Sequence, residues 1–212
     1  SSSLKSKGPL WHKKHRKKGI IPEKLRGVDT DSKWGYGTNK GFYQGYKAHI
    51  NVVFDKDVKC IPFPVDAIIT AANVSDFKKC KTLYWYLPRK VSVQLADKGY
   101  DDSALFFEML TKRQILFLSN LKGSINSTFR LKRYLLLKAF KEEGYGYLRN
   151  TTVEPFNGRL KDSFQIDPLP VRGNKKVKVW VLSSIICYQL IVLFNIKTHR
   201  KMGAVKEIME LL

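Results

Sequence analysis

The sequence predicts an α/β fold in which helices flank a mixed sheet, and three patterns predict it. Residues 42–55 and 60–72 alternate side chains as strands do and are separated by a charged turn, which indicates an antiparallel pair. Residues 91–120 read as strand, helix and strand, which indicates a parallel pair joined by a crossover helix. Residues 179–196 carry no charge and suit a core helix. We therefore expect one domain over residues 1–212.

The first forty residues are expected to form a long basic loop before the antiparallel pair at residues 41–72. They hold few apolar residues in any period and many Gly, Lys and Arg, with the densest run, WHKKHRKK, at residues 11–18. The chain has 39 Lys and Arg against 18 Asp and Glu, a formal net charge of +21, which attracts polyanions such as nucleic acid. This charge indicates a class of partner and no particular chemistry.

The remaining elements follow from helix boundaries. Asp76 is expected to cap a helix that Pro88 ends, and this helix leads into the strand–helix–strand unit, so that residues 76–119 form one region. Residues 120–150 indicate a basic helical connection, and residues 151–212 indicate helices that include the apolar one. The apolar segment reaches the length of a membrane span, but four polar residues favour a buried core helix: Ser183, Ser184, Gln189 and Asn195.

Asp97 is a candidate catalytic residue because of its position in the predicted sheet. It ends the strand that begins at residue 91, and open α/β folds place their sites at the carboxyl ends of strands. The alternative is that Asp97 only caps the turn before Gly99.

Glu154 is the second such acid. Thr151 or Thr152 would cap a helix with Glu154 in its first turn, so a capping role is again the alternative. Lys161 lies two helical turns further on, with Arg159 near it, so one helix face presents an acid and then cations. Such a face suits the hydrolysis or transfer of phosphodiesters, because its carboxylate can hold a metal ion while its lysine steers a phosphate.

Four segments together resemble DDE-type insertion-sequence transposases. LADKGYDD and RNTTVEPFNGRLKD look like the second and third signature blocks of that family, VDTDSKWGYGTNKGFYQGYKAHI is similar to its block with an acidic pair and a Gly-Tyr-Lys-x-His strand, and IITAANVSD is similar to its Thr-x-Ala-Asn-x-x-Asp turn. The resemblance covers nearly the whole chain. It implies a ribonuclease-H-like, retroviral-integrase-like fold, and cleavage and strand transfer of DNA at the ends of an insertion sequence.

By this resemblance, Asp97 is the second and Glu154 the third of three carboxylates that hold two divalent ions, Mg²⁺ or Mn²⁺. The third block keeps the Glu-to-Lys spacing of the YREK-like signature, but Arg149 precedes Glu154 by five residues where the commonest form has four. The cations expected to contact DNA are Lys161, Arg159 and Arg149, together with Lys13, Lys14, Arg16, Lys17 and Lys18 of the basic loop.

The first carboxylate of the family is not evident in the chain. Asp29 and Asp31 are the only early acids of a suitable type, and they lie in a glycine-flanked loop with no apolar strand before it, where they are expected to bind an ion or to shape the loop. The hypothesis is that the first catalytic aspartate immediately precedes Ser1 and that the first strand is missing. The chain by itself is then expected to have weak activity or none.

We expect the partner to be DNA, as transposon ends and target, bound by a homodimer that assembles on it, in the cytoplasm of a prokaryote at the nucleoid and without a membrane. One alternative is a basic nucleic-acid-binding protein without enzyme activity, in which the acids only cap and pair. Another is a ribonuclease-H-like nuclease without strand transfer. A wide separation of Asp97 and Glu154 would exclude a shared pair of metal ions.

Overall fold

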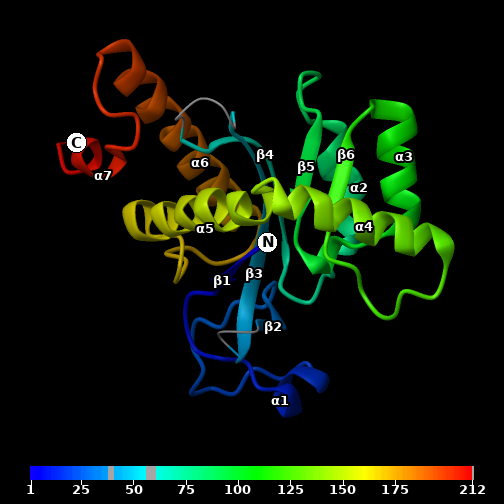
Figure 1. Ribbon diagram of the computed structural model, residues 1–212. Coiled ribbons are helices and arrows are strands. Elements are labelled where there is room, and N and C mark those ends of the chain that lie inside the picture. The colour runs from blue at the N-terminus through cyan, green and yellow to red at the C-terminus, as the bar shows by residue number, and fades with distance from the viewer. Residues whose placement is uncertain (38–40, 56–60, 212) are drawn as a thin grey trace. The chain divides into compact units, whose positions relative to one another are not determined.

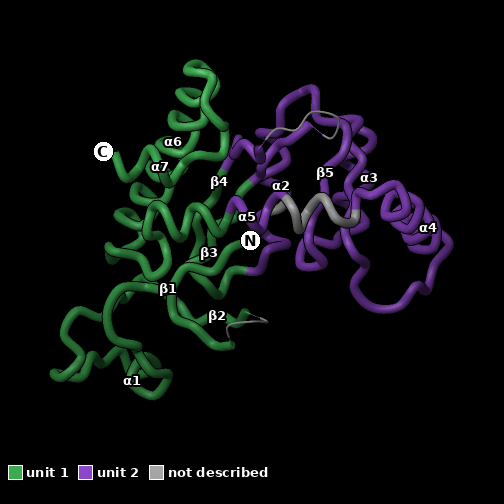
Figure 2. Tube along the Cα trace, turned by 60° about the vertical axis from the view of Figure 1, so that its left-hand side comes forward, with its two compact units in different colours: residues 1–50, 67–74, 157–212 green, residues 51–66, 75–156 purple. Residues whose placement is uncertain are grey.

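The computed structural model describes residues 1–37, 41–55 and 61–211, while the side chains of Cys80 and of residues 146–151 lie outside the description. It is a mixed α/β structure (Figure 1). The chain divides into two compact units (Figure 2). Unit 1 comprises residues 1–50, 67–74 and 157–212, and unit 2 comprises residues 51–66 and 75–156.

The larger sheet lies mostly in unit 1 and consists of β1 (Ser2–Lys5), β2 (Lys33–Gly37), β3 (Gly41–Val53) and β4 (Phe63–Ala71). The long strand β3 is its centre, since β1, β2 and β4 all pair with it. β1 pairs antiparallel with residues 45–48 of β3, and β2 pairs antiparallel with residues 41–45. The β3–β4 pair confirms the two adjacent strands that alternation predicted over residues 41–72.

The first forty residues are not the continuous loop that the sequence predicted, because they contain β1, β2 and the short helix α1 (Lys13–Lys17). The strand β1 escapes a periodicity analysis because Leu4 is its only apolar residue, although Ser2 and Leu4 are both buried. Its pairing depends on a residue distant in sequence: a Cβ atom at Gly45 would clash with the carbonyl oxygen of Leu4. Tertiary pairing therefore makes a strand where local pattern predicts a loop.

Unit 2 contains the parallel pair that the sequence predicted. β5 (Val93–Ala96) and β6 (Leu116–Ser119) run parallel, and α3 (Ser103–Arg113) connects them. They form a second, small sheet, where the sequence predicted a single mixed one. Side chains make the contact with the end of β3, since Gln94 Nε2 donates to Asn51 Oδ1 at 3.2 Å. The other elements are α2 (Phe77–Trp85), the 3₁₀ helix η1 (Lys98–Tyr100), α4 (Thr128–Glu142) and the first part of α5 (Tyr145–Phe164).

The helix α5 begins earlier than the sequence predicted. A helix capped at Thr151 or Thr152 was expected, but α5 begins at Tyr145. Gly144, at φ +90°, allows the chain to turn sharply after α4 and to enter a new helix at once. Glu154 consequently lies in the middle of α5, so its predicted position in a first turn is wrong.

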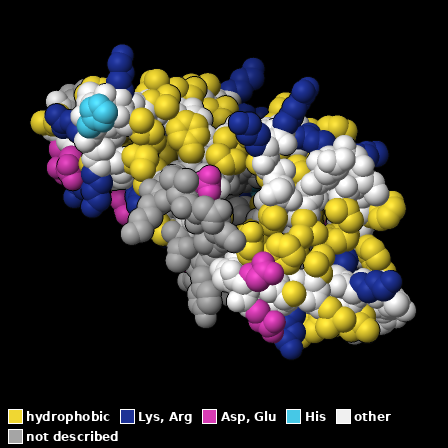
Figure 3. Space-filling model, turned by 45° about the horizontal axis from the view of Figure 1, so that its top comes forward, with side chains coloured by type: hydrophobic (Ala, Val, Ile, Leu, Met, Phe, Trp, Pro, Cys, Tyr) yellow, Lys and Arg dark blue, Asp and Glu magenta, His cyan; other side chains and the backbone are white. Residues whose placement is uncertain are grey.

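The apolar segment forms α6 (Asn174–Lys197), which is followed by the short α7 (Val205–Met209). One side of α6 is buried, including Val181, Ile185, Tyr188 and Val192, which agrees with a core helix of unit 1. By length and composition alone α6 could also cross a membrane. Figure 3 shows a face on which hydrophobic side chains are exposed between projecting Lys and Arg side chains. Four exposed apolar residues of α6 are Val179, Ile186, Leu190 and Leu193, at 52 to 66 % exposure.

Candidate functional site

Asp97 directly follows β5, at the carboxyl end of the parallel pair. Its side chain is exposed, and its Oδ1 accepts a hydrogen bond from the N–H of Lys98 at 2.8 Å. Asp97 therefore caps η1, as the turn-cap interpretation predicted, and it also stands at the strand edge, as the catalytic interpretation requires. The two roles are compatible, because the cap orients the carboxylate at the edge of the sheet.

A second acid supports the turn after Asp97. A Cβ atom built at Gly99 would lie 2.9 Å from Oδ2 of Asp76, so a larger residue there would require the Asp76 carboxylate to shift. The ammonium of Lys122 donates to the carbonyl oxygen of Gly99 at 2.7 Å. Asp76 precedes α2 as predicted, yet its side chain makes no capping hydrogen bond to that helix. The segments IITAANVSD and LADKGYDD thus meet at Asp76 and Gly99, a contact that neither segment reveals by itself.

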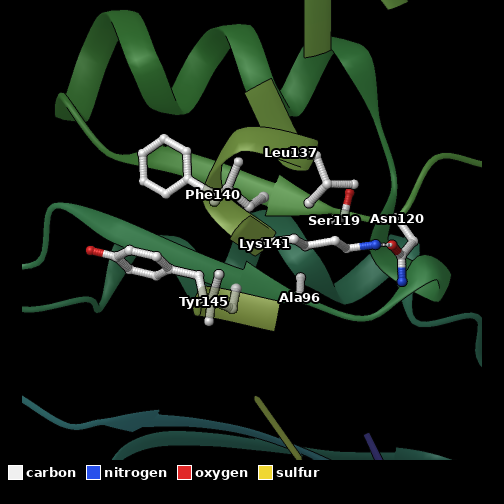
Figure 4. A pocket seen from close by; sticks show the side chains of 9 residues that line it. Ala96, Ser119, Asn120, Leu137, Phe140, Lys141 and Tyr145 are labelled. Atoms are coloured by element: carbon white, nitrogen blue, oxygen red, sulfur yellow. Dashed lines mark hydrogen bonds between the residues drawn. The ribbon is translucent and has the colours of Figure 1, made fainter. Parts of the chain in front are cut away.

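A small hollow of about 50 Å³ lies at the carboxyl ends of β5 and β6. Its lining includes Ala96, Ser119, Asn120, Lys141 and Tyr145, and Lys141 Nζ reaches across to donate to Asn120 Oδ1 at 2.8 Å (Figure 4). The strand edge next to Asp97 is therefore bordered by α4 and by the first residue of α5. Glu154 does not line this hollow; it lies on α5 about 13 Å along the helix axis from Tyr145 at the usual rise per residue.

The two acids that follow Asp97 in the sequence have structural roles. Asp102 begins α3, since its Oδ1 accepts the N–H of Leu105 at 2.9 Å. Asp101 and Arg133 form an ion pair at 2.8 Å in which each side chain is 3 % exposed. Asp101 also accepts the N–H of Lys122 at 2.7 Å, so its carboxylate joins the start of α3, the loop after β6 and α4.

Glu154 is exposed on α5, within unit 2. Asp97 and Glu154 both offer the hard oxygen donors that Mg²⁺ and Mn²⁺ prefer, so the chemistry of these two side chains fits such an ion. Within residues 1–37, 41–55 and 61–211, however, no group of three His, Cys, Asp or Glu residues is placed to hold a metal ion. Asp97 and Glu154 thus suit a divalent ion by type, but the described residues contain no assembled three-ligand site.

Asp29 and Asp31 shape the loop, which is one of the two roles expected for them. Asp29 is 3 % exposed, and its carboxylate accepts the Tyr46 hydroxyl at 2.9 Å and the N–H of Gly173 at 3.2 Å. Asp31 accepts the N–H of Asn174 at 2.8 Å. Both carboxylates therefore hold the first residues of α6, where backbone N–H groups lack helical partners. Burial, reinforced by the neighbouring Asp29 charge, raises the pKa of Tyr46 well above its ordinary value.

Lys161 and Arg159, two of the cations predicted to contact DNA, lie against other residues of unit 1 in the structure. The ammonium of Lys161 is 3.2 Å from Asp167 Oδ2 and donates to the carbonyl oxygen of Ser3 at 3.1 Å. Arg159 is half-buried beside Tyr188, whose pKa is raised by burial and moderated by the Arg159 charge. The side chain of Arg149 lies outside the described residues. In the described chain, Lys161 and Arg159 thus serve the packing of unit 1, whatever else they contact.

The basic run near the N-terminus forms α1, with Lys18 as its C-terminal cap. Trp11, 8 % exposed, anchors it: the N–H of Trp11 donates to Gln44 Oε1, and Trp34 Nε1 donates to the carbonyl oxygen of Trp11 at 2.9 Å. Lys13, Lys14, Lys17 and Lys18 are exposed and Arg16 is half-buried. A tryptophan beside a basic run is the sequence signal that identifies this anchored surface segment.

These features define a basic α/β chain with an exposed acid at the carboxyl end of a parallel strand, a class suited to polyanionic substrates. The profile of the family described as Transposase DDE domain matches residues 10–190, and the chain belongs to this family. Its members are polynucleotidyl transferases, and the family implies a ribonuclease-H-like fold, DNA binding and divalent metal ions. No curated protein and no solved structure gives a significant match to the chain.

Proposed function

We propose that the chain forms the catalytic region of a transposase that cuts DNA at the ends of an insertion sequence and joins them to a target, with Asp97 and Glu154 as ligands of divalent ions. The observation that carries this proposal is the exposed Asp97 carboxylate at the carboxyl end of the parallel pair, in a chain of the DDE transposase family. Asp29 and Asp31 are not included among the ligands, because both hold the N-terminus of α6.

Asp97 acts from a well-supported position. The β5–β6 pair holds the residue before it, and the N–H of Lys98 orients its Oδ1. A ligand oriented before DNA arrives costs little reorganisation during the reaction. Glu154 supplies the second carboxylate from α5. When bound at these oxygens, divalent ions activate the attacking oxygen and stabilise the leaving oxygen of a phosphodiester.

Phosphate contacts are the role we propose for α1 and Lys18. Lys13, Lys14 and Lys17 are exposed, and the anchoring of Trp11 fixes the segment to the sheet of unit 1. Charges held on a folded element bind a DNA backbone with less loss of conformational entropy than charges on a free loop. The contacts would hold DNA without reading its sequence.

The first experiment measures Mn²⁺ binding by electron paramagnetic resonance, with and without DNA that carries the terminal sequences of the element. Mg²⁺-type sites commonly use one or two carboxylates plus substrate phosphates, so we expect binding to be tighter with DNA present. Asp97→Asn and Glu154→Gln should each weaken this binding by about tenfold or more. The same proteins are then assayed with Mg²⁺ for cleavage and strand transfer, and both variants should lose whatever activity the unchanged chain shows.

Glu142→Gln is the matched control, because it removes one exposed carboxylate from α4 in the same unit. Its Mn²⁺ binding should equal that of the unchanged protein. Equal Mn²⁺ binding by all three variants would refute the assignment of Asp97 and Glu154 as ligands. Loss of cleavage with intact strand transfer of precut ends would limit the role of the two acids to the first step.

A further inference from the structure

A row of aromatic side chains lies on one face of β2 and β3. Tyr36 and Phe42 are directly opposite each other in the strand register, and their rings meet edge to face with centroids 5.2 Å apart. Both are strongly exposed, Tyr36 at 62 % and Phe42 at 77 %. Trp34 lies two residues from Tyr36 and therefore on the same face of β2, and its ring centroid is 6.2 Å from that of His12. Trp34 therefore lies beside the start of α1, and the exposed rings of Tyr36 and Phe42 lie further along the same face.

The exposure of this pair is a specific feature of the packing. The next cross-strand pair on the same face is Trp34 and Gln44, and Trp11 covers it. The N–H of Trp11 donates to Gln44, and the carbonyl oxygen of Trp11 accepts from Trp34. Tyr36 and Phe42 lie further along the same face and remain exposed to solvent. Two large exposed rings beside a well-packed segment form an apolar surface that is suited to binding a partner.

The charges around the row favour an anionic partner. α1 follows His12 directly and presents Lys13, Lys14 and Lys17 to solvent. No acidic residue occurs in the sequence before Glu23. The next acids, Asp29 and Asp31, are engaged with the backbone of α6. The surface therefore combines exposed rings with a run of cations that can attract a polyanion.

We propose that Tyr36 and Phe42 stack on unpaired bases of DNA whose phosphates contact α1, so that this surface of unit 1 holds a single strand or a frayed end. The inference rests on the proposed function only in taking DNA as the substrate. Single-stranded DNA presents aromatic base faces and phosphates side by side, whereas a closed duplex buries its base faces. Base–aromatic stacking contributes about 1–3 kcal/mol per base, and the cations add a salt-dependent term common to both forms of DNA.

The test compares a labelled oligonucleotide, as a single strand and as a closed duplex, by fluorescence anisotropy without metal ions. We expect the Tyr36→Ala/Phe42→Ala double variant to lose about tenfold or more of its single-strand affinity and to keep duplex affinity within about twofold. Phe107→Ala is the matched control, because Phe107 is a 59 % exposed aromatic residue on α3 of unit 2. Tyr36→Trp/Phe42→Trp keeps two rings and should retain single-strand affinity.

A base analogue separates stacking from mere proximity. The fluorescence of 2-aminopurine in the single strand should be quenched by the unchanged protein and not by the double alanine variant. Equal losses on single strand and duplex, or no loss on either, would overturn the proposal. If single-strand preference depends on the rings but Mn²⁺ binding does not depend on Asp97, the proposed catalytic function fails and this inference stands. If Mn²⁺ binding depends on Asp97 but single-strand preference does not depend on the rings, only this inference fails.

Discussion

The ammonium of Lys161 lies 3.2 Å from the carboxylate of Asp167, and it also donates to the carbonyl oxygen of Ser3 at 3.1 Å. Asp167 in turn accepts the backbone N–H of Lys5 at 2.9 Å. The lysine that keeps the spacing of the third signature block thus joins α5 to β1 through side-chain and backbone contacts. These polar contacts add to the antiparallel pairing of β1 with β3.

We predict an energetic coupling between Lys161 and Asp167. Their side chains are 21 % and 9 % exposed, so solvent screens the pair only in part and the coupling should be about 1 kcal/mol. The measurement is a double-mutant cycle of Lys161→Met and Asp167→Asn by urea unfolding. Asp162→Asn, an exposed acid on the same helix, is the control and should leave stability unchanged. Strict additivity of the two single changes would show that the contact contributes nothing to folding.

Asp29→Asn should destabilise unit 1 by about 2–3 kcal/mol, because an amide accepts fewer hydrogen bonds than the buried carboxylate it replaces. The loss should extend to α6, whose first backbone N–H groups depend on Asp29 and Asp31. Hydrogen exchange of residues 173–177 is the informative measurement, with faster exchange expected there. Unchanged exchange at the start of α6 would contradict the anchoring role.

Arg133→Met should cost about 3 kcal/mol, since it removes the closest cation of the buried Asp101 carboxylate and leaves only Arg130 at 4.0 Å. Asp101→Asn in the same protein should restore part of that stability, because the amide is neutral and can still accept the N–H of Lys122. Thermal or urea unfolding of the single and double variants measures both effects. A double variant less stable than Arg133→Met would contradict this explanation.

Stability should fall in acid partly through Glu108. Lys112, together with the neighbouring Tyr84 and Lys81, lowers the pKa of Glu108 from 4.5 to about 2. A lowered pKa stabilises the folded state above pH about 4.5, and this contribution disappears as pH falls to about 2. Glu108→Gln should therefore be less stable than the unchanged protein at neutral pH and equally stable near pH 2. Unfolding midpoints of the two proteins across this range test it, and a difference that persists near pH 2 would contradict this role of Glu108.

Replacing Lys13, Lys14 and Lys17 by glutamine should reduce the slope of log affinity against log salt for duplex DNA by about 2.7, if each cation contacts one phosphate. The control is the triple glutamine variant of Lys175, Lys176 and Lys178, which removes the same charge from exposed positions at the start of α6. A smaller change is expected there, because those lysines lie on a different element. If both triple variants reduce the salt slope equally, the reduction reflects the net charge of the chain and not phosphate contacts of α1.

The parallel pair and Asp97 could be predicted from the sequence because their signals are local. Short apolar runs separated by a helix of eleven residues specify β5, α3 and β6, and the acid follows the first run directly. The beginning of α5 could not be predicted in the same way. Threonines before Glu154 suggest a helix cap, but the turn at Gly144 lets the helix begin earlier and carries Pro155 into its interior.

The sequence by itself determined the basic character of the chain, the order of its elements around Asp97 and the segments that identify its family. These depend on neighbours a few residues apart and on composition. Only the tertiary structure decided what Asp29, Asp31 and Lys161 do, because their partners at Gly173, Asn174 and Ser3 lie 143 to 158 residues away along the chain. By type, a carboxylate suits a metal ion or a backbone N–H equally well, and an ammonium suits a phosphate or a backbone carbonyl. Folding selects among them by placing one of these partners within hydrogen-bonding distance.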